Sequence, residues 1–198
     1  MTHRLAFAAA SLLLLLGGSQ IGGGLWIYAK ATLAQVLIKQ AWANRLSGDG
    51  SDRPWPWADT APVAQLAVPA RGIDQIVLAG ASGRTLAFGP GHMDGTAAPG
   101  EAGLAVITGH RDTHFRFLKD LAPGDELLLT DAAGARHRYR VSVGRVVDST
   151  TTGLSLDGIA AQVALVTCYP FDAVNPGGPL RYVVFAEAVA QTPVLAKN

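Results

Sequence analysis

The length, composition and charge of this chain limit what it can be. Its 198 residues allow one sizeable domain of roughly 100 to 150 residues with a smaller part beside it. Sixteen Lys and Arg residues against fifteen Asp and Glu residues give a formal net charge of +1, so the chain lacks the strong positive field of a nucleic-acid-binding protein. We expect one main domain and no nucleic-acid partner.

The first apolar segment, Leu5 to Tyr28, contains no charged residue. As a helix it would be about 36 Å long, enough to cross a hydrocarbon core of roughly 30 Å. We therefore predict that residues 1–29 form an N-terminal transmembrane signal anchor and that the membrane is a partner through this segment. A cleaved signal peptide is the alternative, because the leucines at 12–16 follow Arg4 and residues 17–20 are small or polar.

Charge alone leaves the orientation of this segment open. Only Arg4 precedes it, whereas Lys30, Lys39 and Arg45 follow it. The positive-inside rule by itself would keep the residues that follow in the cytoplasm.

Residues 30–62 are predicted to connect the anchor to the main domain. Apolar residues recur at helical spacing between Lys30 and Leu46, which indicates a juxtamembrane helix. Pro54 and Pro56 interrupt any further helix, and the composition shifts to Gly, Asp, Pro and Trp. We place the domain boundary in this Pro- and Trp-containing linker.

Residues 63–190 show the pattern of short strands separated by turns. Apolar runs and alternating apolar residues predict strands at 63–68, 73–79, 104–107, 127–129, 139–143, 163–168 and 182–186. Arginines alternate with apolar residues after 135, so we expect a hairpin with one solvent-facing side there. The pattern predicts a mainly β domain, a closed or nearly closed barrel of about seven or eight strands, with a C-terminal tail at 191–198.

Cys168 is the only cysteine, which excludes an internal disulfide and a multi-cysteine metal site. By residue type alone it could be a small buried hydrophobic residue. Its position favours a different interpretation, because three polar residues stand at predicted strand ends. His110 ends one strand, Cys168 ends another and Arg181 begins a third.

Acyl transfer by a cysteine needs these three residue types. A thiol near its usual pKa of about 8.5 is mostly protonated at neutral pH, so a nucleophilic cysteine needs a base or a cation nearby. His110 would move that proton. A guanidinium such as that of Arg181 would stabilise the oxyanion of a tetrahedral intermediate without changing its own charge.

The words around these residues resemble the motifs of the sortase family. Leu165-Val166-Thr167-Cys168 is similar to the family's cysteine signature, and Arg181, within Leu180-Arg181-Tyr182-Val183-Val184, is similar to its arginine. The family's histidine motif is similar to the segment Ile107-Thr108-Gly109-His110-Arg111-Asp112-Thr113 of this chain. The resemblance extends from Trp55 to Ala188 and is nearest to the sortases of Gram-negative, marine proteobacterial origin, called class GN. The segments that carry it are 55–59, 86–92, 110–117, 168–172 and 177–182.

The resemblance implies a sortase-like eight-stranded β-barrel with short helices behind an N-terminal transmembrane helix. It implies a single-pass protein of the inner (cytoplasmic) membrane with its catalytic domain on the extracytoplasmic, periplasmic side. By the same resemblance, Cys168 attacks an LPXTG-like C-terminal sorting signal of a target protein and forms a thioester. His110 serves as acid and base, Arg181 holds the carbonyl or oxyanion, and the acyl group passes to an amine acceptor.

Four other residues are considered as substrate-binding or supporting. Asp112 would orient His110 or cap the turn, and His92 would mark a tight turn near the substrate groove. Thr167 has the opposite strand parity to Cys168, so its side chain should point away from the thiol. His114 stands four residues after His110, a metal-like spacing in a helix, but no Glu follows His110 and a turn is expected, which favours a loop-packing or substrate-lining role.

We predict no metal and no cofactor. The acidic residues that might gather around calcium do not have the spacing of an EF-hand; they are Asp94, Glu101, Asp148 and Asp157. Two alternatives to a transpeptidase stay open: a cysteine peptidase that releases the target to water, and a non-catalytic, membrane-tethered barrel that binds a peptide and buries Cys168.

Overall fold

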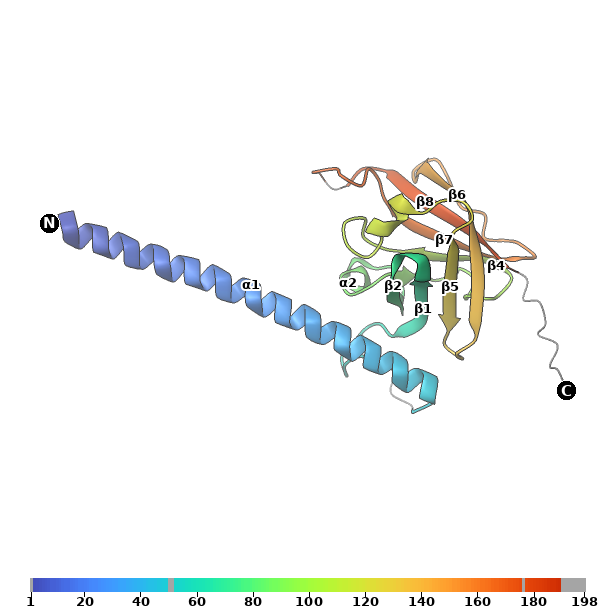
Figure 1. Ribbon diagram of the computed structural model, residues 1–198, viewed down its shortest axis with the longest axis horizontal. Helices are drawn as coiled ribbons and strands as arrows, with labels where there is room; N and C mark the ends of the chain where they lie inside the picture. The colour runs from blue at the N-terminus through green and yellow to red at the C-terminus, as the bar shows by residue number, and fades with distance from the viewer. Residues whose placement is uncertain (1, 50–51, 176, 190–198) are drawn as a thin grey trace. The chain divides into compact units, whose positions relative to one another are not determined.

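The computed structural model describes residues 2–49, 52–175 and 177–189 (Figure 1). The predicted C-terminal tail at 191–198 therefore lies outside the described residues. The chain forms two compact parts, Met1–Leu37 and Ile38–Asn198, and the boundary between them falls inside a helix.

The N-terminal helix α1 runs without interruption over Thr2–Ser47. Between Leu12 and Ser47 it is long and apolar enough to cross a membrane, a test of length and composition that a signal sequence also passes. The large apolar side chains at 12–16 and 25–28 are more than half exposed. Within the second part, the last turns of α1 bury Ile38, Ala41 and Trp42 at helical spacing.

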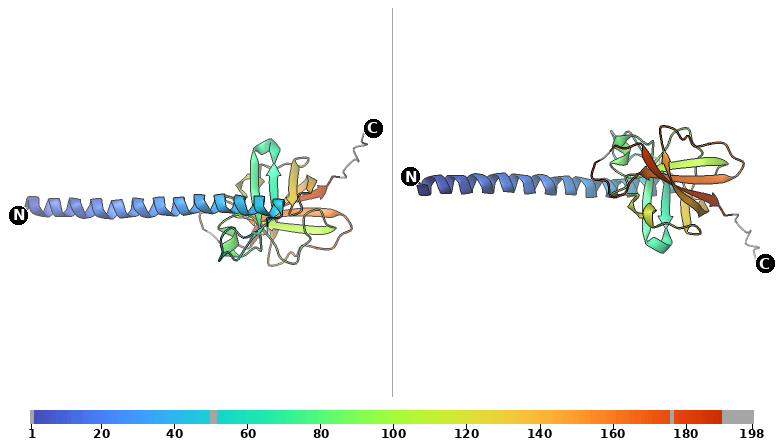
Figure 2. Two further views of the ribbon diagram at one scale, coloured as in Figure 1. Left: turned by 90° about the horizontal axis from the view of Figure 1, so that it is seen from below. Right: turned by 90° about the horizontal axis from the view of Figure 1, so that it is seen from above.

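The second part is a closed barrel (Figure 1, Figure 2). Its strands follow the order β1-β2-β3-β4-β7-β8-β6-β5, and pairing between β5 and β1 closes it. The pairs β2–β3 and β4–β7 are parallel and the others antiparallel. The bounds are β1 (Pro62–Val68), β2 (Ile73–Ala79), β3 (Gly91–His92), β4 (Gly103–Thr108), β5 (Glu126–Asp131), β6 (Arg136–Asp148), β7 (Ala161–Cys168) and β8 (Leu180–Ala188).

Three short helices connect the strands: η1 (Pro69–Arg71), α2 (Gly83–Leu86) and η2 (Arg116–Asp120). The predicted mainly β, closed barrel is thereby confirmed. One element was not predicted. The sequence suggested a tight turn at His92, whereas the structure has the two-residue strand β3, which joins β2 to β4. A side chain at Gly91 would collide with the backbone of Gly80, so this strand requires glycine there.

The barrel has an interior core and a second apolar cluster on its outer face. Alternate residues of β1, namely Ala64, Leu66 and Val68, are fully buried and join the interior core. In β7 the odd-numbered Val163 and Leu165 face the interior, whereas Ala164 belongs to the outer cluster with Leu104, Val106 and Val183. Each large apolar side chain buried in this way stabilises the fold by about 1.5–3 kcal/mol. The middle of β7 is therefore covered on both faces.

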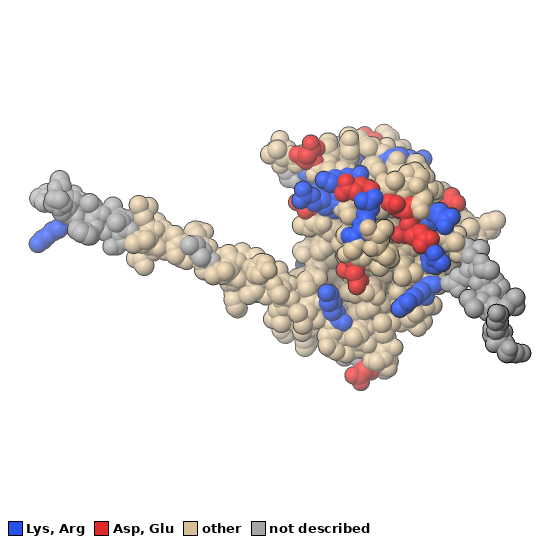
Figure 3. Space-filling view, in the orientation of Figure 1, with Lys and Arg blue, Asp and Glu red and all other residues tan. Residues whose placement is uncertain are grey.

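Charged residues of both signs are mixed over the barrel face shown in Figure 3, as the near-neutral net charge predicts. Several charged residues of the barrel are paired. Arg138 binds both carboxylate oxygens of Glu126 at 2.9 and 3.0 Å, and Arg71 contacts Asp125 at 3.1 Å. Exposed pairs of this kind contribute little to stability because water and salt screen them.

Candidate active site

The strand register brings the three predicted catalytic residues together in one row. Cys168 is the last residue of β7 and pairs directly with Arg181 of β8. On the other side of β7, Thr108 of β4 is level with Val166, and the Gly109 amide extends this ladder with a bond of 3.1 Å to the Val166 carbonyl. Two residues beyond this Thr108–Val166 pair, His110 follows the end of β4 and Cys168 ends β7.

The Cys168 and Arg181 side chains share one face of the sheet, because residues directly opposite in an antiparallel pair point the same way. Cys168 has the parity of Ala164 and Val166, which belong to the outer apolar cluster, so this face is the outside of the barrel. Val147 of β6 pairs with Arg181 from the other side and belongs to the same cluster. The thiol, which is half-buried, therefore stands at the end of an apolar strip on the outer surface.

His110 begins a turn that is built around a buried ring. The carbonyl of His110 accepts the amide of Phe115 at 2.9 Å, and the Phe115 ring is fully buried. A Cβ on Gly109 would lie only 2.8–3.0 Å from that ring, so the residue before His110 has to be glycine. His110 itself is exposed at the surface of the turn.

Thr167 ties the histidine and cysteine segments together below the surface. Its side chain is buried, with 2% exposure, and its hydroxyl donates a hydrogen bond of 2.7 Å to the carbonyl of Gly109. As its parity predicts, Thr167 lies on the opposite face to Cys168, with the interior residues Val163 and Leu165. It therefore acts on the peptide unit that carries His110 and makes no contact of its own with the outer face.

Arg111 forms a second tie, which sequence reasoning did not single out. Its Nη1 donates to the carbonyl of Pro170 and its Nη2 to the carbonyl of Ala173, both at 2.8 Å. The only signal in the sequence is its place in the motif, directly after His110. The partners are backbone carbonyls, which leave no mark in the sequence.

The Arg181 guanidinium is anchored on its own loop. Its Nη1 donates to the carbonyls of Gly178 and Leu180 at 2.7 and 2.9 Å. Asp148 lies near it at the end of β6. Hydrogen bonds from the hydroxyl and amide of Thr150 hold the pKa of Asp148 below its ordinary value, and the positive charge of Arg181 adds to this.

His114 and Asp112 lie in the same turn as His110. Burial and the neighbouring charge of His110 lower the pKa of His114, and Asp112 opposes this change. The charge of His110 therefore influences the pKa of His114. The Asp112 carboxylate is exposed and receives no hydrogen bond from the described part of the chain. Neither the orienting nor the capping contact considered for Asp112 is present in this structure.

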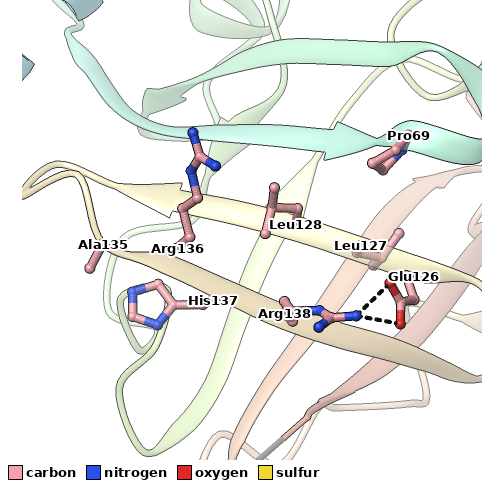
Figure 4. A pocket seen from close by; sticks show the side chains of 8 residues that line it. All are labelled: Pro69, Glu126, Leu127, Leu128, Ala135, Arg136, His137 and Arg138. Atoms are coloured by element: carbon pink, nitrogen blue, oxygen red, sulfur yellow. Dashed lines mark hydrogen bonds and ion pairs between the residues drawn. The ribbon is translucent and has the colours of Figure 1, made fainter. Parts of the chain in front are cut away.

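His92 lies apart from this row. Its Nε2 donates to the carbonyl of Ala97 at 2.9 Å, and the Thr96 hydroxyl is 3.2 Å from the same nitrogen. The ring borders a separate cavity of about 490 Å³ beside Asp131 and His137. A larger cavity, of about 810 Å³, lies along the β5–β6 hairpin (Figure 4). Its described lining residues include none of the predicted site residues, so it carries no argument for catalysis.

Aromatic rings in the segment after Cys168 pack against a tyrosine of β8. Phe171 packs edge-on against Tyr182, with ring centroids 5.3 Å apart, and Tyr169 stacks on the same tyrosine at 6.4 Å. Both Phe171 and Tyr182 contact the interior core. Among the described residues, no group of three or more His, Cys, Asp or Glu side chains is arranged to hold a metal ion.

The chain is similar to known proteins over this whole region. Residues 66–189 match the family model for the sortase domain. Sortase D of Bacillus subtilis (strain 168) is 32% identical over 125 residues, which are 63% of this chain and 62% of that protein, so the match spans less than two thirds of the relative's length.

Solved structures show the same relationship. The sortase D5 transpeptidase of Clostridium perfringens superposes with a TM-score of 0.57 at 27% identity, covering 66% of this chain and 80% of that chain. Sortase A of Corynebacterium diphtheriae superposes with a TM-score of 0.61 at 25% identity, covering 81% and 86%. With a family model that matches more than half of its length, the chain belongs to the sortase family.

Proposed function

We propose that the chain is a membrane-anchored cysteine transpeptidase of the Gram-negative, class GN branch of the sortases. In this proposal it cleaves an LPXTG-like sorting signal near the C-terminus of a target protein and joins the target to an amine. The observation that carries it is the direct pairing of Cys168 with the cationic Arg181 across β7 and β8, with His110 two residues beyond the end of the neighbouring strand β4.

The chemistry follows from the three side chains. The Cys168 thiolate attacks the carbonyl carbon of the scissile peptide bond, and the electron pair moves to the oxygen. His110 then protonates the departing amine, the C–N bond breaks, and the acyl group remains on sulfur as a thioester. In the second half, His110 takes the proton of the incoming amine as that nitrogen attacks the thioester and expels the thiolate.

Arg181 stabilises the oxyanion in both halves. Its hydrogen bonds to described residues both use Nη1, whereas a guanidinium offers five N–H donors in all, so Nε and Nη2 retain donors for a substrate oxygen. Anchoring by Nη1 is useful here, because a donor fixed in advance costs no reorganisation when charge develops.

The surface that leads to Cys168 fits an extended apolar peptide segment. The outer cluster supplies its floor, and Val174, a large apolar residue six positions after Cys168, stands almost fully exposed. An exposed apolar side chain in the loop that follows a reactive group favours a peptide ligand that covers it on binding.

Helix α1 supports the membrane part of the proposal. Residues 1–29 would serve as a single-pass anchor in the inner membrane, residues 30–62 as the juxtamembrane helix and linker, and residues 63–190 as the catalytic barrel on the periplasmic side. The support is the apolar helix at 12–47 together with the family membership.

Of the supporting residues, Thr167 has a contact that serves the site, His114 is electrostatically coupled to His110, and Asp112 lies in the same turn. The contacts of His92 give it no such role.

The test is intact-mass detection of an acyl adduct on the full chain in detergent, after mixing with an LPXTG-like peptide. A mass increase equal to the amino-terminal part of the peptide is expected on the wild type and not on Cys168→Ala. In Arg181→Ala the rate of adduct formation should fall by about 100-fold or more, as for other lost oxyanion donors. Adding a glycine-type amine should convert the adduct into a joined product, whereas release only as the free acid would make the protein a hydrolase.

Absence of the adduct on the wild type would contradict the proposal for this peptide. Alkylation of the thiol then decides between the remaining possibilities. A thiol that reacts only after unfolding would support the non-catalytic barrel, and a reactive thiol would leave the chemistry with a different peptide.

A further inference from the structure

We propose that Arg111 is a positioning residue that holds the turn after Cys168 in place against the histidine segment and so sets the alignment of His110 with the thiol. This inference rests on the proposed function. Its physical basis is the pair of hydrogen bonds from one guanidinium to the carbonyls of Pro170 and Ala173, each 2.8 Å long.

The position of Arg111 in the chain gives these bonds their effect. Arg111 is covalently joined to His110, and Pro170 stands two residues after Cys168. One side chain therefore links the backbones that carry the base and the nucleophile. Its two contacts span 59 and 62 residues of sequence.

The ladder of β4 and β7 cannot provide this link by itself. Its last cross-strand bond runs from the Gly109 amide to the Val166 carbonyl, one residue before His110 and two before Cys168. The buried Thr167 hydroxyl reaches only as far as Gly109. Beyond those points His110 and the turn at 169–173 lie outside the sheet, and Arg111 is the tie that continues where the ladder ends.

A guanidinium suits two separate acceptors because its N–H groups are held in a planar fork, so Nη1 and Nη2 reach different carbonyls at once. The Pro170 carbonyl also accepts the amide of Ala173 at 3.4 Å, so Arg111 binds a turn that already has its own closing bond. A lysine ammonium is a single point charge and would not fix both carbonyls in one geometry.

The turn has a second support that does not depend on Arg111. Phe171 and Tyr182 pack on each other and on the interior core. Loss of Arg111 should therefore leave the barrel folded and the turn near its place, while the fine alignment of His110 with Cys168 is lost. A misplacement of about 1 Å in reacting groups lowers rates by about 100-fold, whereas a partly exposed hydrogen bond contributes little to global stability.

The experiment compares Arg111→Ala and Arg111→Lys with the wild type and with a matched control, Arg116→Ala, in the full chain in detergent. Arg116 is exposed in the same surface segment, and its side chain makes no hydrogen bond or ion pair with other described residues. Three quantities are measured: kcat and KM for acyl transfer from the peptide, the rate of Cys168 alkylation at pH 7 without peptide, and the thermal midpoint. Guanidinium chloride at low millimolar concentration is then added to each protein.

We expect Arg111→Ala to lower kcat by about 10- to 100-fold with KM changed by no more than about threefold. Its alkylation rate should fall toward that of His110→Ala, while its thermal midpoint stays close to that of the wild type. Added guanidinium should restore part of the activity of Arg111→Ala alone. Arg111→Lys should remain impaired, and Arg116→Ala should equal the wild type.

A kcat and an alkylation rate of Arg111→Ala equal to or above those of the wild type would overturn the inference. A loss of activity that only follows a lower thermal midpoint, with no response to guanidinium, would overturn it as well, because the role would then be structural. If the wild type forms no adduct, the proposed function fails first, and the alkylation rates still decide whether Arg111 aligns His110 with the thiol.

Discussion

Thr167 shows at the scale of one residue how a buried contact can serve an exposed site. The residue is only 2% exposed. Its hydroxyl donates a hydrogen bond to the carbonyl of Gly109, which stands 58 residues earlier in the chain. Gly109, which provides that carbonyl, is itself buried and cannot accept a larger residue because of the Phe115 ring. The hydrogen bond from Thr167 and the close packing of Gly109 against the Phe115 ring therefore fix the peptide unit that precedes His110.

Thr167→Val should destabilise the protein by about 1–2 kcal/mol, because valine keeps the shape of threonine but leaves the Gly109 carbonyl buried without its partner. The thermal midpoint should fall by about 2–4 °C for each kcal/mol. Circular dichroism on heating measures this in detergent at fixed composition. Thr167→Ser retains the hydroxyl and should lose less; equal losses in the two variants would mean that the methyl group matters and the hydrogen bond does not.

Prediction from the sequence was uneven at this scale. Residue type and position at strand ends sufficed to propose His110, Cys168 and Arg181, because acyl transfer needs these groups together. The contacts of Arg111 and Thr167 were not predicted, because each side chain binds a backbone carbonyl of a segment 58 to 62 residues away. A carbonyl is present at every residue, so nothing in the sequence marks which one is used.

The β5–β6 hairpin illustrates the scale of a single element. The side chain of Asp131 closes its turn by accepting the amides of Ala133 and Ala135, both at 2.9 Å. The same carboxylate accepts Nε2 of His137 at 2.7 Å. Burial alone would raise the pKa of Asp131, but the bonds from His137, Ala135 and Ala133 outweigh it, and the pKa lies below its ordinary value.

This depressed pKa predicts how the hairpin depends on pH. A carboxyl whose pKa is lower in the folded state contributes stability above its unfolded pKa of about 3.9, and loses it as the pH falls through the folded pKa. Asp131→Asn should therefore cost about 1 kcal/mol at pH 7. Denaturation at a series of pH values should show this difference shrinking below about pH 4. A difference that stays constant down to pH 2 would contradict the assignment.

Prediction of elements depended on their length. Seven strands carry regular alternation or continuous apolar character and were predicted, although the predicted strand at 139–143 covers only part of β6; they are β1, β2, β4, β5, β6, β7 and β8. The two-residue strand β3 has no periodicity to detect. Its existence follows from Gly91, whose missing side chain lets the backbone of Gly80 approach, and a close approach between distant segments is not visible in one sequence.

At the scale of the whole molecule, the order of the strands decides whether there is a site. Alternation predicts which residues face inward, but it does not say that β4 lies beside β7, a parallel pairing across two intervening strands in sequence. That pairing brings the end of β4, two residues before His110, level with Val166, two residues before Cys168. The resemblance of the motifs implied an eight-stranded barrel in which the three residues act together, but it did not give the order of the strands.

The proposed anchoring of the barrel on the periplasmic side of an inner membrane is the last property to test, and the chain provides its own probe. Cys168 is the only cysteine and is half-buried, so a membrane-impermeant maleimide reports where the barrel lies. If the barrel is periplasmic, cells with a permeabilised outer membrane but an intact inner membrane should be labelled as fully as lysed cells, with Cys168→Ala unlabelled in both. Labelling only after lysis would place the barrel in the cytoplasm, as Lys30, Lys39 and Arg45 alone would suggest. In that case the three positive charges that follow the apolar segment would determine the orientation of the chain, and a secreted target protein could not reach the thiol.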